Sequence, residues 1–125
     1  MLVVGRIDRE RIGEVFPDLM TDDVIITDER IQHIRERHPR DYERYERYLR
    51  EIVENPDYVV EANKPASAVL LKSFEENGKR FQAILRLHTS VDDPEFKNSI
   101  ITFMKIKDKE WKRLLNNKKV LYKRA

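Results

Sequence analysis

The chain contains no cysteine and only three histidines. A disulfide framework, a thiolate metal site and a cysteine nucleophile are therefore excluded, and few ligands remain for zinc. No apolar run approaches the roughly 20 residues needed to cross a bilayer, and the apolar stretch at the N-terminus is too short for a secretory signal. We therefore expect a cytoplasmic protein that needs no metal ion, no other cofactor and no membrane.

Charge is plentiful but unevenly distributed. Charged residues make up 38% of the 125-residue chain and hydrophobic residues 40%. Residues 1–96 contain 15 Lys and Arg against 21 Asp and Glu, whereas residues 97–125 contain 10 against 2. A basic C-terminal part favours an anionic partner, most often a nucleic acid, although a solvated basic surface explains the same pattern.

The length suits a single domain over residues 1–125 with one hydrophobic core. Within it we expect an N-terminal extension over 1–22 and a core over 23–122. In the core, a helix is predicted from an N-cap at Thr27 to about Arg37, because Pro39 follows. A second helix is predicted over 40–54, with Tyr42, Tyr45, Leu49 and Ile52 at helical spacing on its inner face.

Strand patterns follow these helices. Beta-rich runs cover 58–61, 68–74, 81–88 and 99–106. A hairpin turn is expected at 75–78, where Gly78 allows a tight turn. Weaker signals indicate short strands at 2–7, 22–26 and 120–122, and short helices at 9–16 and 108–116. The order predicts an α+β fold, in which N-terminal helices pack on an antiparallel sheet of about four strands.

Two of the three histidines, His33 and His38, lie five residues apart near the end of the first predicted helix, among several arginines. Histidine can give or take a proton near neutral pH without help from its surroundings. On an ideal helix the two side chains differ in direction by about 140°, so they flank one site only if the helix end bends around it. A helix-dipole role for His38 and an exposed polar position for His33 would explain the same residues.

The predicted strands supply further polar candidates. Alternation places Arg86 and His88 on one face of their strand, which is either a solvent face or the floor of a site. Thr102 and Lys105 interrupt an otherwise apolar strand, where a polar group needs a partner or a function. An unperturbed histidine side chain has a pKa of about 6.5, so two histidines would serve both proton transfers of RNA cleavage by the ribose 2′-hydroxyl. Arg86 and Thr102 would hold the phosphate, and no metal would be required.

Ordered motifs make the chain resemble the phage-associated branch of the barnase–EndoU–colicin–RelE-like (BECR) nucleases. The motifs are IQHIRERHP at 31–39, NPD at 55–57, Arg86 and NSIITF at 98–103, and the resemblance spans about Asp23 to Tyr122. It implies helices on a four-stranded antiparallel sheet and a metal-independent ribonuclease, typical of toxins and phage effectors. RNA would be the substrate, and an immunity or antitoxin protein is a candidate partner.

The resemblance also implies roles for individual residues. It places His33 and His38 on the helical histidine motif, Arg86 at the phosphate, and Ser99 and Thr102 on a late-strand hydroxyl motif. The predicted catalytic residues are thus His33, His38, Arg86 and Thr102. The predicted substrate-binding residues are Arg37, His88, Ser99 and Lys105.

Two other functions fit the sequence. A non-catalytic RNA-binding or protein-interaction module would use the basic C-terminal part to bind phosphates through counterion release. A toxin-neutralising or structural phage component would use the acidic first 96 residues as a contact surface. The enzyme alone requires the histidines, so histidine replacement distinguishes it from both. The sequence does not indicate an oligomeric state.

Overall fold

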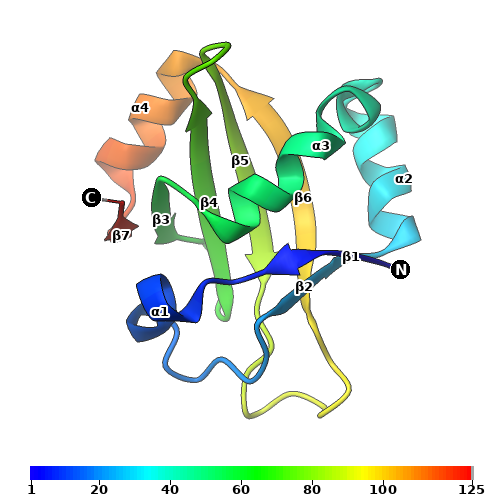
Figure 1. Cartoon of the computed structure of the whole chain (residues 1–125), viewed down its shortest axis with the longest axis vertical. Coiled ribbons are helices and arrows are strands. Elements are labelled where there is room, and N and C mark those ends of the chain that lie inside the picture. Colours follow the sequence, from blue (N-terminus) through cyan, green and yellow to red (C-terminus); the bar gives the residue numbers. More distant parts are fainter. Residues whose placement is uncertain (125) are drawn as a thin grey trace.

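The computed structural model describes residues 1–124, and it contains one mixed sheet of seven strands with helices against it (Figure 1). The strand order is β1-β2-β6-β5-β4-β3-β7. All neighbouring strands are antiparallel except β2 and β6, which are parallel. The strands are β1 (Leu2–Arg6), β2 (Asp23–Ile26), β3 (Tyr58–Glu61), β4 (Ser67–Phe74), β5 (Lys79–Arg86), β6 (Asn98–Ile106) and β7 (Val120–Lys123). The helices are α1 (Arg9–Ile12), α2 (Asp28–Arg37), α3 (Asp41–Glu54) and α4 (Asp108–Asn117), and a 3-10 turn over Gly13–Val15 follows α1.

The predicted four-stranded antiparallel sheet with N-terminal helices is wrong. The four beta-rich runs do form β3, β4, β5 and β6, which pair antiparallel in sequence order. Three short strands extend this sheet, β1 and β2 at one edge and β7 at the other, and β2 makes it mixed. Segments of four or five residues give weak sequence signals, but they gain backbone hydrogen bonds once a long strand offers its edge.

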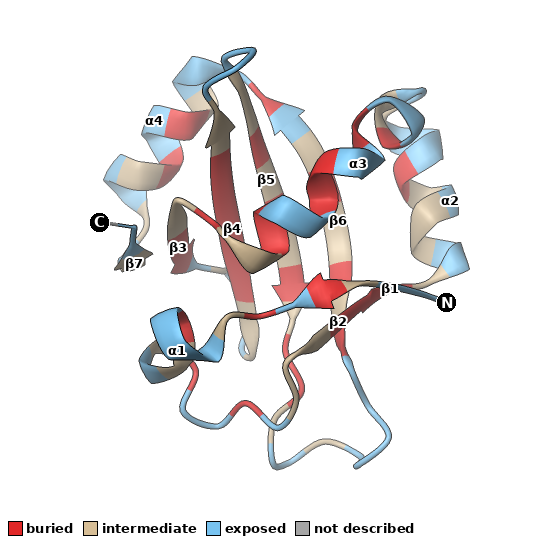
Figure 2. Ribbon diagram, viewed as in Figure 1, coloured by how far each residue is buried: buried red, intermediate tan, exposed pale blue. Residues whose placement is uncertain are grey.

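Helices α2 and α3 begin and pack largely as their sequences predict. The Thr27 hydroxyl caps α2 by accepting the Arg30 N–H at 3.2 Å, and acidic residues occupy the first turn, where the helix dipole favours them. Helix α3 crosses the face of β4, β5 and β6 and turns its buried side towards them (Figures 1 and 2). Its predicted inner residues, among them Tyr45 and Leu49, are buried. The Tyr45 ring meets Phe81 edge-on at 5.0 Å between centroids, so α3 closes the main core.

The N-terminal segment adds to the same core. Ile7, Ile12, Phe16 and Leu19 are buried in the cluster that holds the inner residues of α3. Within residues 1–124, no helix has the length and apolar character that crossing a membrane would require.

Helix α4 covers only part of the opposite sheet face. Trp111 and Leu114 pack there against Val60, Leu71 and Ile106, a cluster separate from the main core. Because side chains alternate along a strand, this second cluster and the α3 core lie on opposite faces of the sheet. The portion of this face that α4 leaves uncovered lies over the middle of β4, β5 and β6, and it is there that a groove forms.

Candidate active site

A groove of about 680 Å³ occupies the uncovered part of the second sheet face. Strands β4, β5 and β6 form its floor, the β3–β4 loop and α4 form its walls, and α2 contributes one residue. The charged side chains that line it are the cations Arg30, Lys64, Arg86, Arg113 and Lys118 and a single carboxylate, Glu61. Low-dielectric walls with charges of one sign concentrate the electrostatic field, so the groove attracts an anion.

The strand register places the predicted hydroxyls on the sheet face that carries the groove, although neither Ser99 nor Thr102 is among the residues that line it. Arg86 lies opposite Ser67 of β4 on one side and opposite Ser99 of β6 on the other. Thr102 lies opposite Ile84, which also lines the groove. Residues directly opposite across neighbouring strands share a face with Cβ atoms about 5 Å apart. Arg86, Ser99 and Thr102 are therefore neighbours on one face, as a common site requires.

An irregularity in β6 makes this arrangement possible. Ser99 and Thr102 are three residues apart, so a regular strand would turn them to opposite faces. The β5–β6 register shifts between Ile84 and Leu85, which pair with Thr102 and Ile100, and leaves Ile101 as an extra residue. Such a bulge reverses the alternation beyond it. Both hydroxyls consequently lie on the side of Arg86.

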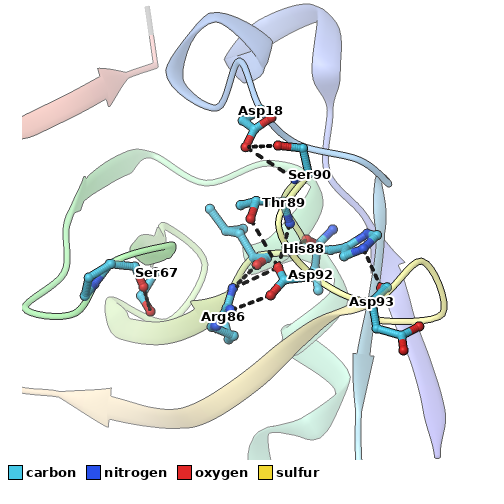
Figure 3. Close-up of polar contacts among 11 residues, drawn as sticks. Asp18, Ser67, Arg86, His88, Thr89, Ser90, Asp92 and Asp93 are labelled. Atoms are coloured by element: carbon cyan, nitrogen blue, oxygen red, sulfur yellow. Dashed lines mark hydrogen bonds and ion pairs between the residues drawn. The ribbon is translucent and has the colours of Figure 1, made fainter.

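Arg86 is held in place at the end of β5 (Figure 3). Its Nη2 donates to Asp92 Oδ1 at 2.8 Å and its Nη1 to the Leu87 carbonyl, while its guanidinium lies 5.3 Å from the Phe96 ring centroid. Asp92 also accepts the Thr89 N–H at 2.8 Å. The pKa of the Asp92 carboxyl lies below its ordinary value, chiefly because of the Thr89 backbone hydrogen bond and further because of Arg86. A charged Asp92 thus orients the Arg86 fork from the loop that follows β5.

His88 lies in the interior, outside the groove lining. The residue is 5% exposed, and its Nε2 lies 3.0 Å from the Asp93 carbonyl oxygen (Figure 3). Because a carbonyl only accepts, Nε2 donates and Nδ1 is left buried without a partner. The His88 backbone N–H donates to Asn98 Oδ1 at 2.7 Å, and Asn98 Nδ2 donates to the carbonyls of Thr21 and Asp23. This network joins the loop after β5 to β2 and β6.

The two helical histidines lie in different surroundings. His33 lines a shallow hollow on α2 together with Arg30, and Arg30 also lines the groove. One helical turn thus separates His33 from a groove residue. His38 ends α2, and its backbone N–H donates to the Ile34 carbonyl at 2.8 Å. Because α2 stays helical through Arg37, the two histidines keep their angular separation and do not face each other.

None of the four predicted substrate-binding residues lines the groove, and Arg37 and Lys105 lie away from it. Arg37 is exposed in the last turn of α2, the end farther from Arg30. Lys105 is exposed and lies opposite Phe81, which belongs to the core beneath α3. Cross-strand partners share a face, so Lys105 lies on the other side of the sheet from Arg86.

A comparison with known protein families shows the family of this chain. A family model described as phage-Barnase-EndoU-ColicinE5/D-RelE like nuclease 2 (PBECR2) matches residues 3–123. The chain belongs to the PBECR2 family. The resemblance inferred from the motifs is thereby confirmed, and the chain is a nuclease, whose substrate is a nucleic acid. No match was found among curated proteins or among solved structures.

Four groove residues of this PBECR2 nuclease were not among the predicted site residues, although two of them belong to the basic C-terminal part for which the sequence suggested phosphate binding. Lys64 comes from the β3–β4 loop, Arg113 and Lys118 from the α4 region, and Gln82 from β5. The basic character of residues 97–125 was a signal for α4, whereas nothing in the sequence shows that a loop and a helix 50 residues apart face each other. Within residues 1–124, no three His, Asp or Glu side chains are grouped as ligands for a metal ion.

Proposed function

We propose that this PBECR2 nuclease is an endoribonuclease that cleaves single-stranded RNA in the groove on the open sheet face. The main support is the position of Arg86, whose guanidinium is oriented by Asp92 and whose backbone lies between Ser67 and Ser99 in a groove lined by further cations. A fixed guanidinium is suited to binding a phosphate through two parallel hydrogen bonds. A groove with five cations and one carboxylate fits a phosphodiester chain.

The proposed reaction is an internal transesterification. The ribose 2′-oxygen attacks the adjacent phosphorus, the bond from phosphorus to the 5′-oxygen breaks, and the products are a 2′,3′-cyclic phosphate and a free 5′-hydroxyl. A base accepts the proton of the 2′-hydroxyl, and an acid gives one to the leaving 5′-oxygen. DNA lacks the 2′-hydroxyl, so this chemistry selects RNA.

The groove residues have complementary roles in this proposal. Negative charge increases on the phosphate oxygens in the transition state, and Arg86 and Arg30 would stabilise it. The hydroxyls of Ser99 and Thr102 would donate to the same oxygens. His33, one turn from Arg30, is our first acid–base candidate, and His38 is the second because it lies farther along α2. Ser99, Thr102 and the two helical histidines would act from beside the groove lining, whereas Arg37, His88 and Lys105 would affect RNA beyond the cleaved bond or the loop that positions Arg86.

The deciding experiment is cleavage without metal. Purified protein, with Arg86→Ala beside it, is incubated with total RNA in EDTA and the new ends are sequenced. We expect 2′,3′-cyclic phosphate ends that the variant produces far more slowly. Intact RNA with folded wild-type protein would contradict the proposal. RNA binding that weakens with salt but yields no new ends would support a binding module instead.

The proposal extends to cellular context. A metal-independent ribonuclease would act in the cytoplasm, as a toxin or phage effector, and its cationic groove offers an acidic immunity or antitoxin protein a complementary surface. Co-purification of such an inhibitor, with loss of cleavage when it is added, would test this part separately.

A further inference from the structure

The groove floor changes its chemical character along β5. Arg86 is cationic, Ile84 is aliphatic and Gln82 is an amide, and all three line the groove. At about 3.3 Å per strand residue, Ile84 lies about 7 Å and Gln82 about 13 Å from the backbone of Arg86. A phosphate held by Arg86 would therefore leave the ribose and base of the same nucleotide above Ile84 and towards Gln82.

The walls at this end of the groove suit a flat, partly apolar ligand. Val69 of β4 lies opposite Ile84, and Leu114 of α4 lines the same space. Val69 and Leu114 are buried against the α4 cluster, so their positions are fixed by packing. Small-molecule sites typically combine such apolar walls with a few placed polar groups.

Gln82 is the placed polar group. Its side chain is half-buried on the floor, and its amide offers a donor and an acceptor side by side. Neighbouring polar groups are paired with one another: Lys118 donates to Asn63, and Arg86 to Asp92. Gln82 takes part in neither of these pairs. A paired donor and acceptor matches the hydrogen-bonding edge of a nucleobase, as in the bidentate contacts of glutamine with adenine.

We infer that the part of the groove between Ile84, Leu114 and Gln82 is a nucleobase subsite, in which Gln82 hydrogen-bonds the base next to the cleaved phosphate. The inference rests on the proposed ribonuclease function and specifies its substrate. The aliphatic side chains cover the faces of the base, which every nucleotide shares. Gln82 contacts the edge, where the four bases differ, and it is therefore the specificity-determining residue.

Nucleotide binding tests the subsite without requiring cleavage. Wild-type protein is titrated with the 3′-monophosphates of adenosine, guanosine, cytidine and uridine, and the Kd of each is measured by NMR. Gln82→Met keeps the length of the side chain and removes both hydrogen-bonding groups. We expect wild type to discriminate among the bases, and the variant to reduce the ratio of its strongest to its weakest Kd by about 3- to 10-fold.

A second variant tests the direction of the effect. The Gln82→Glu carboxylate accepts but does not donate, so it matches the adjacent N–H donors of guanine. We expect the affinity for guanosine 3′-monophosphate to increase relative to the affinities for the other three nucleotides. Asn63→Asp adds the same charge to the groove wall and should weaken all four equally. Thermal melting confirms that each variant is folded.

The outcomes separate this inference from the proposed function. Equal Kd values for the four nucleotides in wild type, Kd ratios in both Gln82 variants that match those of wild type, or no binding at all would overturn the base subsite even if RNA is cleaved. Base-selective binding that Gln82→Met abolishes, with no cleavage of any RNA, would overturn the ribonuclease proposal and keep the subsite.

Discussion

Arg86 and Asp92 form a forked ion pair, with Nη2 and Oδ1 2.8 Å apart and Nη1 and Oδ2 3.4 Å apart. The same carboxylate accepts the Thr89 backbone N–H, so the end of β5 and the following loop are joined through one side chain. Asp92 fixes the direction of the guanidinium, but it also offsets part of its charge. Asp92 therefore improves the orientation of the Arg86 guanidinium but weakens its attraction for an anion.

Asp92→Asn should separate these two effects. We expect RNA cleavage to slow by about 10- to 100-fold because Arg86 is less well oriented, while RNA binding at low salt stays equal or tightens. Single-turnover rates and binding by fluorescence anisotropy would be measured on the same RNA. Asp93→Asn is the matched control, since the exposed Asp93 carboxylate only accepts the Glu95 N–H at 3.0 Å. An unchanged cleavage rate in Asp92→Asn would contradict the orienting role.

Acid should weaken the fold partly through this ion pair. The folded state lowers the pKa of Asp92 below its ordinary 3.8, so the stabilisation is complete above that value and is lost as the pH falls towards the folded pKa. Urea unfolding of wild type between about pH 2 and pH 5 should show this decline. Asp92→Asn should show a shallower decline over the same range. Parallel curves for the two proteins would argue against the pair as a source of acid sensitivity.

The two helical histidines should differ in their importance for cleavage. We expect His33→Ala to slow the chemical step by about 10²- to 10⁴-fold, the usual contribution of a positioned acid or base, and His38→Ala to slow it by less than about 10-fold. The reason is that His33 lies one turn from a groove residue, whereas His38 ends the helix. Rates measured with saturating RNA would decide between them. The reverse order would assign the acid–base role to His38.

The cations of the groove walls should contribute to binding without regard to sequence. Lys64→Ala and Lys118→Ala should each weaken RNA binding and reduce the slope of log K against log salt by about 0.7, the value for one phosphate contact on a single strand. Lys109→Ala is a suitable control because Lys109 is exposed on α4 but does not line the groove. If the slope of log K against log salt is the same in all three variants, Lys64 and Lys118 do not contact the RNA.

Asn98 should be important for stability. It is 0% exposed, and its side chain satisfies the His88 N–H and the carbonyls of Thr21 and Asp23. Asn98→Ala leaves these groups unpaired in the interior, so we expect a loss of about 2–4 kcal/mol in the free energy of unfolding. Urea denaturation would measure it, with the exposed Asn116→Ala as the control, expected within about 0.5 kcal/mol of wild type. A small loss for Asn98→Ala would mean that water replaces the amide.

Local sequence signals predicted the long elements, and of the eight predicted site residues Arg86 lines the groove. The Thr27 cap, the apolar face of α3 and the four long strands follow from capping and periodicity, which act over a few residues. Alternation predicted that Arg86 lies on the polar face of its strand and the family motif indicated Thr102, and the strand register gives both residues the same face. The sequence indicated the short edge strands but not that they join the sheet. Their pairing depends on residues far apart in the chain, such as Val24 and Asn98.

The remaining site residues depend on contacts that no local pattern encodes. Simple alternation placed His88 on the same face as Arg86. In the structure the loop after β5 folds over His88, and the His88 ring nitrogen Nε2 donates to the Asp93 carbonyl. The β6 bulge, which puts Ser99 and Thr102 on the same face as Arg86, is a single extra residue without a sequence marker. The positions of Lys64 and Lys118 relative to each other exist only in the folded molecule.

The parallel pairing of β2 with β6 links the beginning of the fold to strands made much later. Val24 pairs with Asn98 only after β6 has been synthesised, and α4, which forms a wall of the groove, follows β6 along the chain. While the polypeptide is still being synthesised, Arg86 emerges before Asn98 has closed the sheet and before Lys118 exists. The nascent chain therefore lacks a complete groove until both β6 and α4 have been translated.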